Sequence, residues 1–295
     1  MSEESLIEQR RRIFMESLIS DGVYAIVSSK YGSVASNSDA ASKTSRIIGL
    51  KLAYALKVPQ GKKMSGQTCG AKFETAIASF VSKTFAELQH LRPGRWEVCD
   101  LGNNGRRSAV GFAQYEHLAH LDELTSKDTE LMTVLGNDYM VSPDVVVTRM
   151  PVDDDEINVD GKLFVGENTS KKADLRMANG GKPILHASIS AKWTIRSDRA
   201  QNSRTEALNL IRNRKGRLPH IMVVTAEPSP NRLASVALGT GDIDCVYHFA
   251  LYELIDAVEA YFNETGSDEP LETLMALVNG KRLKDISDLP LDLCV

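Results

Sequence analysis

An aspartate and a lysine stand at the ends of two apolar segments. Asp144 opens the segment 144–148, and Lys192 closes the segment that begins at residue 184. If both segments are strands of one sheet, a carboxylate and an ammonium can meet at the same edge. A carboxylate that holds a divalent metal ion, beside a lysine that orients a water, can hydrolyse a phosphodiester bond. The pattern therefore favours metal-dependent phosphodiester hydrolysis, although a Pro-Asp pair and a Ser-x-Lys triplet each also occur by chance.

Further groups can complete this site. Side chains 190 and 192 share one face of a strand, so Ser190 lies beside Lys192 while the side chain of Ala191 points inward. The backbone carbonyl of Ala191 can still serve as a neutral metal ligand. Glu206 follows 14 residues after Lys192 and reaches back to the strand end if its helix packs on the sheet. Oxygen ligands suit magnesium, so Asp144, Ala191 and Glu206 are candidate ligands.

A basic segment begins at the same lysine. Residues 192–217 carry eight cationic and two anionic side chains, in a chain whose net charge is −4. Such segregation gives a basic surface suited to phosphate, although a solvated helix face is the alternative. Arginine matches guanine O6 and N7, and aspartate accepts from cytosine N4. Arg196, Asp198 and Arg199 can therefore read G·C pairs, with a surface ion pair as the alternative.

Composition restricts the class of protein. The chain has 295 residues, of which 42% are hydrophobic and 25% are charged, and we expect a single domain over 1–295. The four cysteines lack the paired spacing of a zinc site or a disulfide framework. There is no apolar run of 18 residues, and the first residues lack a signal-peptide pattern. We expect a cytoplasmic protein with reduced thiols and no membrane partner.

Hydrophobic periodicity predicts the elements that must position these residues. It predicts helices near residues 3–20, 46–56, 71–91, 115–135, 200–214 and 248–262, with loops at 31–45 and 59–70. Strands are expected at 144–148, 184–193, 219–225 and 242–247, and the acidic residues 153–156 are expected in a surface excursion. The prediction is an α/β fold with a central mixed β-sheet flanked by α-helices. A helical part over about 1–140 precedes the catalytic sheet and recognition elements over about 141–295.

Four motifs together resemble the CCGG family of type II restriction endonucleases. They are Ser-Pro-Asp144, Ser190-Ala-Lys192, Arg196-Ser-Asp198-Arg199 and Glu206. The family belongs to the PD-(D/E)xK superfamily, and its second acidic residue has moved from the strand to the following helix. The resemblance spans nearly the whole chain and is densest over residues 186–252 and 278–293. It implies the restriction-endonuclease-like fold.

The resemblance also implies roles for individual residues. Glu74, in Lys-Phe-Glu-Thr, joins Asp144, Ala191 and Glu206 as a metal ligand. The implied catalytic residues are Asp144, Lys192, Glu206, Glu74 and Ser190. The implied base-reading residues are Arg196, Asp198 and Arg199 for the inner CCGG, Arg232 and Asp39 for the outer G·C pair, and Gln67 for the minor groove.

The family's activity gives the functional expectation. The resemblance implies a homotetramer, a dimer of dimers, that cuts double-stranded DNA at a CCGG-containing palindrome, with GCCGGC as the expected site. It implies 5′-phosphates, 5′ overhangs, one or two Mg²⁺ ions per active site, and a companion DNA methyltransferase in a bacterial host. Two alternatives are a non-restriction nuclease of the same fold and a catalytically inactive sequence-specific DNA-binding protein.

Overall fold

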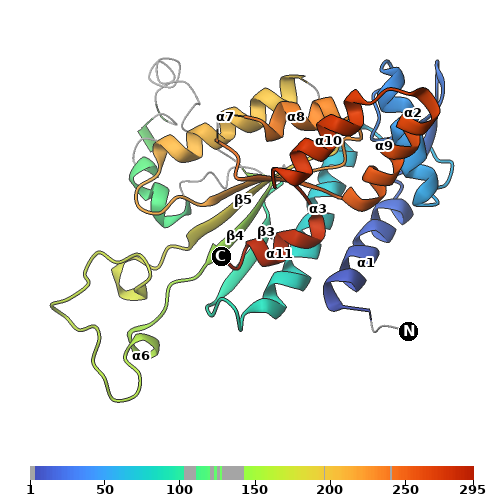
Figure 1. The fold of residues 1–295 in the computed structure, drawn as a ribbon. Coiled ribbons are helices and arrows are strands. Elements are labelled where there is room, and N and C mark those ends of the chain that lie inside the picture. Colours follow the sequence, from blue (N-terminus) through green and yellow to red (C-terminus); the bar gives the residue numbers. More distant parts are fainter. Residues whose placement is uncertain are drawn as a thin grey trace.

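The centre of the molecule is a mixed sheet of six strands (Figure 1). The computed structural model describes residues 4–102, 111–119, 123–124, 127, 143–195, 197–239 and 241–295, and for residues 197–200 it describes only the backbone. The strands lie in the order β3 (Trp96–Asp100), β4 (Val145–Arg149), β5 (Ile184–Lys192), β6 (His220–Thr225), β7 (Cys245–His248) and β8 (Leu283–Asp285). The pairs β3–β4 and β4–β5 are antiparallel, and β5 to β8 are parallel.

Helices cover both faces of this sheet. In Figure 1, α3 (Gly66–Phe85) and α11 (Leu289–Asp292) lie below it, and α7 (Ser197–Asn213), α8 (Pro230–Ala237) and α10 (Glu269–Asn279) lie above it. α1 (Leu6–Ser20) packs on α3, and α2 (Lys43–Ala55) packs on α9 (Leu251–Thr265). The predicted α/β class, with a mixed sheet between helices, is confirmed. Among the described residues, no helix is long and apolar enough to cross a membrane.

The part expected to be helical also contributes strands. β3 lies at the edge of the main sheet, and β1 (Ile26–Ser29) pairs with β2 (Gly32–Ala35) in a separate hairpin. The prediction missed β3 because an edge strand is half exposed and carries a weak apolar signal. The loop expected over 31–45 likewise contains β2. Because β3 pairs with β4, the N-terminal and C-terminal parts share one sheet.

α3 begins earlier than the sequence indicated. The hydroxyl of Ser65 accepts the backbone N–H of Thr68 at 3.1 Å, which satisfies a free donor of the first turn and starts the helix at Gly66. Of the helix expected over 115–135, the described part is a 3-10 helix, Ala113–Leu118, followed by residues 119, 123–124 and 127. The remaining positions lie outside the described residues.

Aromatic packing anchors the end of the central strand. Trp193, directly after β5, is buried, and its ring centre lies 5.1 Å from that of Phe73 on α3 and 5.7 Å from that of Tyr24. Both ring pairs meet edge to face, an arrangement that favours aromatic contacts. Phe73, Ile77, Phe80, Val81 and Phe85 lie on the buried face of α3. This core fixes the position at which β5 leaves the sheet.

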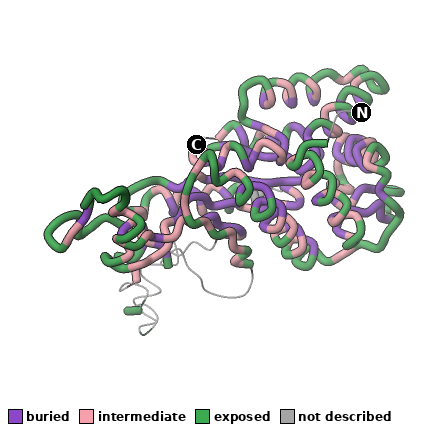
Figure 2. Tube along the Cα trace, turned by 90° about the horizontal axis from the view of Figure 1, so that it is seen from below, coloured by how far each residue is buried: buried purple, intermediate pink, exposed green. Residues whose placement is uncertain are grey.

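The connection between β4 and β5 extends away from the sheet as an arm, residues 150–183 (Figures 1 and 2). It contains the short helix α6 (Asp154–Ile157) and a 3-10 helix, Met177–Asn179. The guanidinium of Arg176 donates to both carboxylate oxygens of Asp154 at 2.6 Å and ties the two sides of the arm together. The acidic residues 153–156 therefore lie in a surface excursion, as expected.

Candidate active site and base-reading residues

Asp144 and Lys192 meet at one edge of the sheet, as predicted. β4 and β5 are antiparallel, and the pairing of Val145 with Ile189 sets Asp144 beside the last residues of β5. The ammonium of Lys192 donates to Oδ2 of Asp144 at 3.0 Å. About one-fifth of each side chain is exposed (17% for Lys192 and 21% for Asp144). The pair is held by the sheet and remains reachable from solvent.

The carboxylate of Asp144 accepts two further hydrogen bonds from β5. The backbone N–H of Ala191 donates to Oδ2 at 2.7 Å, and the hydroxyl of Ser190 lies 3.4 Å from the same atom. In an extended strand, the N–H and C=O of one residue face the same neighbouring strand. The carbonyl of Ala191 is therefore directed toward the side on which Asp144 lies, as its predicted ligand role requires.

Glu206 reaches the end of β5 from helix α7, as predicted. Its carboxylate accepts a hydrogen bond from the hydroxyl of Ser190. Burial raises the pKa of Glu206, and the charge of Asp144 raises it further, while the ammonium of Lys192 opposes both effects. Ser190 therefore lies between two carboxylates, those of Asp144 and Glu206.

Glu74 faces the same edge from helix α3. Burial, together with the negative charges of Asp144 and Asp100, raises the pKa of Glu74 to about 7, although the ammonium of Lys192 lowers it. α3 packs across β3, β4 and β5, so the helix carries this carboxylate to the strand ends. The structure thus brings Glu74 together with Asp144, as the family resemblance implied.

Asp100 is an acidic residue of this edge that sequence reasoning missed. It ends β3 and pairs with Val145 in the sheet register, so it lies next to Asp144. The hydroxyl of Thr75, on α3, donates to Oδ2 of Asp100 at 2.7 Å. The sequence offered one indication of this role, because Asp100 is an acidic residue at the end of a segment in which burial alternates. The indication was not recognised because β3 itself was not predicted.

The donor set at this edge fits a hard divalent cation by its chemistry. The side chains are four carboxylates and one ammonium, namely Asp144, Glu74, Glu206, Asp100 and Lys192. A divalent cation stabilises the ionised forms of carboxylates whose pKa values are raised by burial and mutual repulsion. Among the described residues, no three such groups converge closely enough to form a complete metal site. The fit therefore rests on the kind of donors present.

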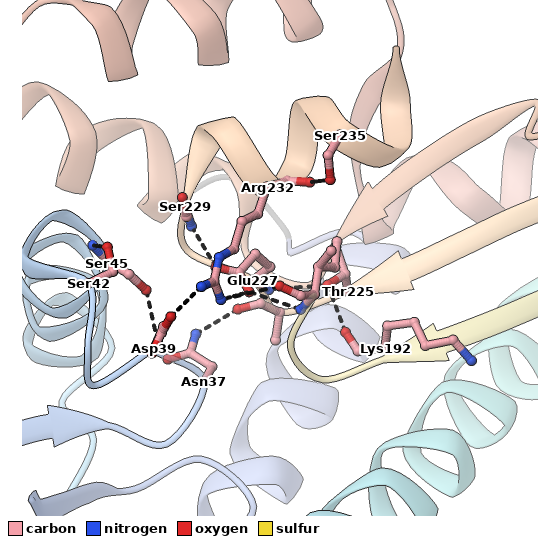
Figure 3. A network of polar contacts seen from close by, with 12 residues as sticks. Asn37, Asp39, Ser42, Ser45, Lys192, Thr225, Glu227, Ser229, Arg232 and Ser235 are labelled. Carbon is pink, nitrogen blue, oxygen red and sulfur yellow. Dashed lines mark hydrogen bonds and ion pairs between the residues drawn. The ribbon is translucent and has the colours of Figure 1, made fainter. Parts of the chain in front are cut away.

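Arg232 and Asp39 form an ion pair near the end of β5, apart from the ammonium of Lys192 (Figure 3). Arg232 lies on α8, Asp39 precedes α2, and their side chains form an ion pair although 193 positions separate them in sequence. The carboxylate of Asp39 also accepts the backbone N–H of Ala41 at 2.9 Å. The two residues predicted to read one outer base pair are therefore neighbours in space.

Comparison with known proteins agrees with this geometry. A family model described as NgoMIV restriction enzyme matches residues 14–295. The chain belongs to the NgoMIV restriction enzyme family. It is 48% identical over 291 residues to the type II restriction enzyme NgoMIV of Neisseria gonorrhoeae, and the match covers 98% of this chain and 99% of that enzyme. As a member of the NgoMIV restriction enzyme family, the protein is a type II restriction endonuclease that acts on double-stranded DNA.

The other base-reading residues expected in this NgoMIV-family enzyme are placed in part. Gln67 is exposed in the first turn of α3, two turns before Glu74 on the same helix. Arg196 lies outside the described residues, and so do the side chains of Asp198 and Arg199, whose backbone belongs to the first turn of α7. The base-reading roles of all four residues stay predictions.

Proposed function

We propose that this endonuclease cleaves both strands of DNA at a CCGG-containing palindrome, GCCGGC, in a magnesium-dependent reaction. The observation that carries the proposal is the contact between Asp144 and Lys192, 3.0 Å apart, beside the carboxylates of Glu74 and Glu206. One ammonium among several carboxylates can orient a water and a phosphate while the carboxylates hold cations.

We assign one or two Mg²⁺ ions to this edge. The residues that would hold them are Asp144, Glu206, Glu74 and the carbonyl of Ala191, all oxygen donors of the kind that magnesium binds. When bound, magnesium supplies positive charge at the scissile phosphate and acidifies the attacking water. Ser190, whose hydroxyl contacts both Asp144 and Glu206, holds these two carboxylates in their relative orientation.

Lys192 positions the reacting groups. Its ammonium donates to Asp144 at 3.0 Å, and the buried ring of the next residue, Trp193, anchors the backbone at this end of β5. From this place the ammonium can donate to a phosphate oxygen and to the attacking water, which sets the water in line with the leaving 3′ oxygen. The proposed products carry 5′-phosphates and four-base 5′ overhangs.

Base reading is assigned to both sides of the strand end. Arg196, Asp198 and Arg199, on or just before the first turn of α7, contact the inner CCGG from the major groove. Arg232 and Asp39 contact the outer G·C pair together, an assignment that their ion pair supports. Gln67 contacts the minor groove. A palindromic site requires two copies of the chain related by a two-fold axis, each reading one half-site.

We further propose that the active assembly is a homotetramer, a dimer of dimers. The arm formed by residues 150–183 supports this assembly. Leu163 and Phe164 in it are 81% and 57% exposed, and Val159, a few positions earlier in the chain, is also exposed. Apolar side chains gathered at one exposed place mark a surface that associates with another. The described surface of the arm is thus suited to a contact with a second copy.

The biological setting follows from the reaction. An enzyme that cuts every unmodified copy of its site would also cut the genome of its own host. We therefore place it in the bacterial cytoplasm together with a DNA methyltransferase that modifies the same palindrome.

One experiment tests the proposed reaction, site and products together. A sequenced plasmid is incubated with the enzyme in Mg²⁺ or in EDTA, and the cut ends are mapped on both strands. We expect discrete fragments in Mg²⁺ alone, with cuts at each GCCGGC and 5′ overhangs of four bases. Fragments with scattered ends would indicate a nuclease of another kind, and site-specific binding without cutting would indicate an inactive DNA-binding protein.

A further inference from the structure

Glu227 is a fully buried carboxylate between the catalytic and base-reading residues (Figure 3). Its side chain has no exposed area. Oε2 accepts the backbone N–H of Ile195 at 2.9 Å, and Oε1 accepts the backbone N–H of Ser229 at 3.1 Å. Arg232 is its charged neighbour, with Nη1 at 3.7 Å from Oε2. A buried charge is costly to maintain, so one held by so few partners is expected to have a specific task.

The first connection of Glu227 runs to the inner base-reading segment. Ile195 directly precedes Arg196, and both of its backbone polar groups are held by this cluster. Glu227 accepts the N–H of Ile195, and Nη1 of Arg232 donates to its carbonyl at 3.2 Å. The position of Ile195 therefore depends on a carboxylate and a guanidinium that themselves contact each other.

The second connection runs to the catalytic strand. The hydroxyl of Thr225 donates to the carbonyl of Lys192 at 2.7 Å and accepts the backbone N–H of Glu227 at 3.2 Å. Thr225 is fully buried, so no water replaces these contacts from bulk solvent. One side chain thus joins the backbone of Lys192 to that of Glu227.

The third connection runs to the proposed outer base pair. Arg232 holds Asp39 with its Nη2 atom, while its Nη1 atom lies on Ile195 and Glu227. If Arg232 turns to a guanine edge, it must rearrange its ion pair with Asp39, because a guanidinium has a fixed fork of donors. The same rotation moves the Nη1 atom that holds the carbonyl of Ile195.

We propose that Glu227 is a positioning residue that couples the reading of the outer base pair by Arg232 to the placement of Arg196 and Lys192. This coupling rests on the proposed outer-pair role of Arg232 and Asp39. A matching outer pair draws Arg232 toward the guanine and so shifts the hold on Ile195 that Arg232 shares with Glu227, whereas a mismatched pair gives Arg232 no such contact and leaves this hold as it is in the free enzyme. Glu227 touches neither DNA nor metal in this scheme. It acts through Ile195, Thr225 and Arg232.

Glu227→Gln is the direct test. Both carboxylate oxygens accept backbone N–H groups, and an amide offers a single acceptor oxygen, so one N–H must face an NH₂ group. Asp285→Asn is the matched control, because Asp285 is also fully buried, accepts the N–H groups of Leu251 and Ser287 at 2.9 Å each, and pairs with an arginine, Arg11. It lies three strands from Lys192 along the same sheet edge, about 14 Å away.

The readout is the ratio of single-turnover cleavage rates on three duplexes, of which one carries GCCGGC, one an altered outer pair and one an altered inner pair. The wild type is expected to prefer the first over the second by about 5- to 150-fold. Glu227→Gln should lose most of that outer-pair ratio and cut the first duplex more slowly, and its inner-pair ratio should fall as well because Ile195 directly precedes Arg196. Asp285→Asn should lower the melting temperature and leave both ratios unchanged.

The outcomes separate the coupling from the proposed site. A wild type that ignores the outer pair overturns the proposed site and the coupling with it. A discriminating wild type beside a Glu227→Gln variant with the same ratio overturns the coupling alone. If Glu227→Gln does not fold, Thr225→Val cuts the connection to Lys192 and should slow cleavage of bound GCCGGC duplex by about 5- to 10-fold without weakening its binding. An unchanged rate in that variant overturns the coupling.

Discussion

The ammonium of Lys192 donates to Oδ2 of Asp144 at 3.0 Å, between the ends of two antiparallel strands. The same oxygen accepts the N–H of Ala191 at 2.7 Å, so the position of the lysine head is set by the backbone of its own strand as well as by its partner's charge. In the proposed reaction the carboxylate of Asp144 would hold a cation, and the ammonium of Lys192 would donate to a phosphate oxygen and to the attacking water. Their contact therefore places these two functions side by side.

Asp144→Ala is expected to abolish cleavage while leaving specific DNA binding intact. The substitution removes the central carboxylate donor, with a loss on the order of 10³-fold or more in single-turnover rate. Binding of GCCGGC duplex should stay equal or become tighter, because a negative charge near the phosphate is gone. Asp292→Asn breaks a comparable Lys–Asp pair, that with Lys284 at 2.6 Å, and serves as the control that keeps activity. Cleavage by Asp144→Ala in Mg²⁺ would contradict the assignment of the active site.

Glu74→Gln is expected to weaken the response to magnesium. Glu74 faces Asp144 and Asp100, and the amide removes one anionic donor from this set. The Mg²⁺ concentration for half-maximal cleavage should rise about 10- to 100-fold, with DNA binding in EDTA unchanged. Lys72→Ala, at a half-buried position two residues away on α3 where the ammonium donates to the carbonyl of Asp21 at 3.1 Å, is a control for helix effects. An unaltered Mg²⁺ titration would remove Glu74 from the proposed ligands.

Arg232 and Asp39 are expected to act as one unit in base reading. Arg232→Ala should lower discrimination at the outer pair by about 1–3 kcal/mol without altering preference at the inner pair. Asp39→Asn should have a smaller effect of the same kind, and the double variant should be no worse than Arg232→Ala, since residues in one ion pair are not additive. The effects of the two single variants and the double variant are compared by their cleavage rates on three duplexes, which carry GCCGGC, an altered outer pair or an altered inner pair. Additive losses would show that the two residues read the DNA independently.

The arm is expected to hold the tetramer together. Changing Leu163 and Phe164 together to serine removes the two most exposed apolar side chains of the arm. Light scattering should then report dimers in place of tetramers, with an unchanged melting temperature at high dilution, because these side chains contribute little to the core. Tyr54→Ser, on α2, removes a side chain that is 61% exposed and is the control. Tetramers that persist in the arm variant would place the contact elsewhere.

Glu227 is expected to make the stability of the enzyme depend on pH. Burial raises the pKa of Glu227 to about 7, from 4.5 in the unfolded chain, against the opposing hydrogen bond of Ile195 and the charge of Arg232. A raised carboxyl pKa adds stability that is complete below about 4.5 and is lost as pH rises through about 7. The free energy of unfolding of the wild type, minus that of Glu227→Gln, should therefore fall by about 2.5 kcal/mol between pH 5 and pH 8. Denaturant titrations measure this difference, and a constant difference would refute the raised pKa.

Local sequence was sufficient to predict β4 and β5 and the meeting of Asp144 with Lys192 at their ends. β4 and β5 are buried, and their continuous apolar runs are visible without any knowledge of the fold. Asp144 and Lys192 stand at their ends, so the alternation of a strand was enough to predict that both reach one edge. Glu206 followed from helical spacing in the next segment. The identity of Glu74, Gln67 and Arg232 as site residues required the family resemblance, because no local pattern marks them.

The tertiary structure alone decided which distant groups became neighbours. Asp100 joins the carboxylates because β3 is an edge strand, whose half-exposed residues carry little hydrophobic signal. The burial of Glu227 could not be predicted from the sequence either, because a buried carboxylate is recognisable only once the atoms around it are placed. The pairing of Arg232 with Asp39 depends on how α8 packs near the loop before α2, a contact that forms between segments far apart in sequence. Sequence fixes side-chain chemistry and local periodicity, whereas long-range packing decides which charges share one low-dielectric environment.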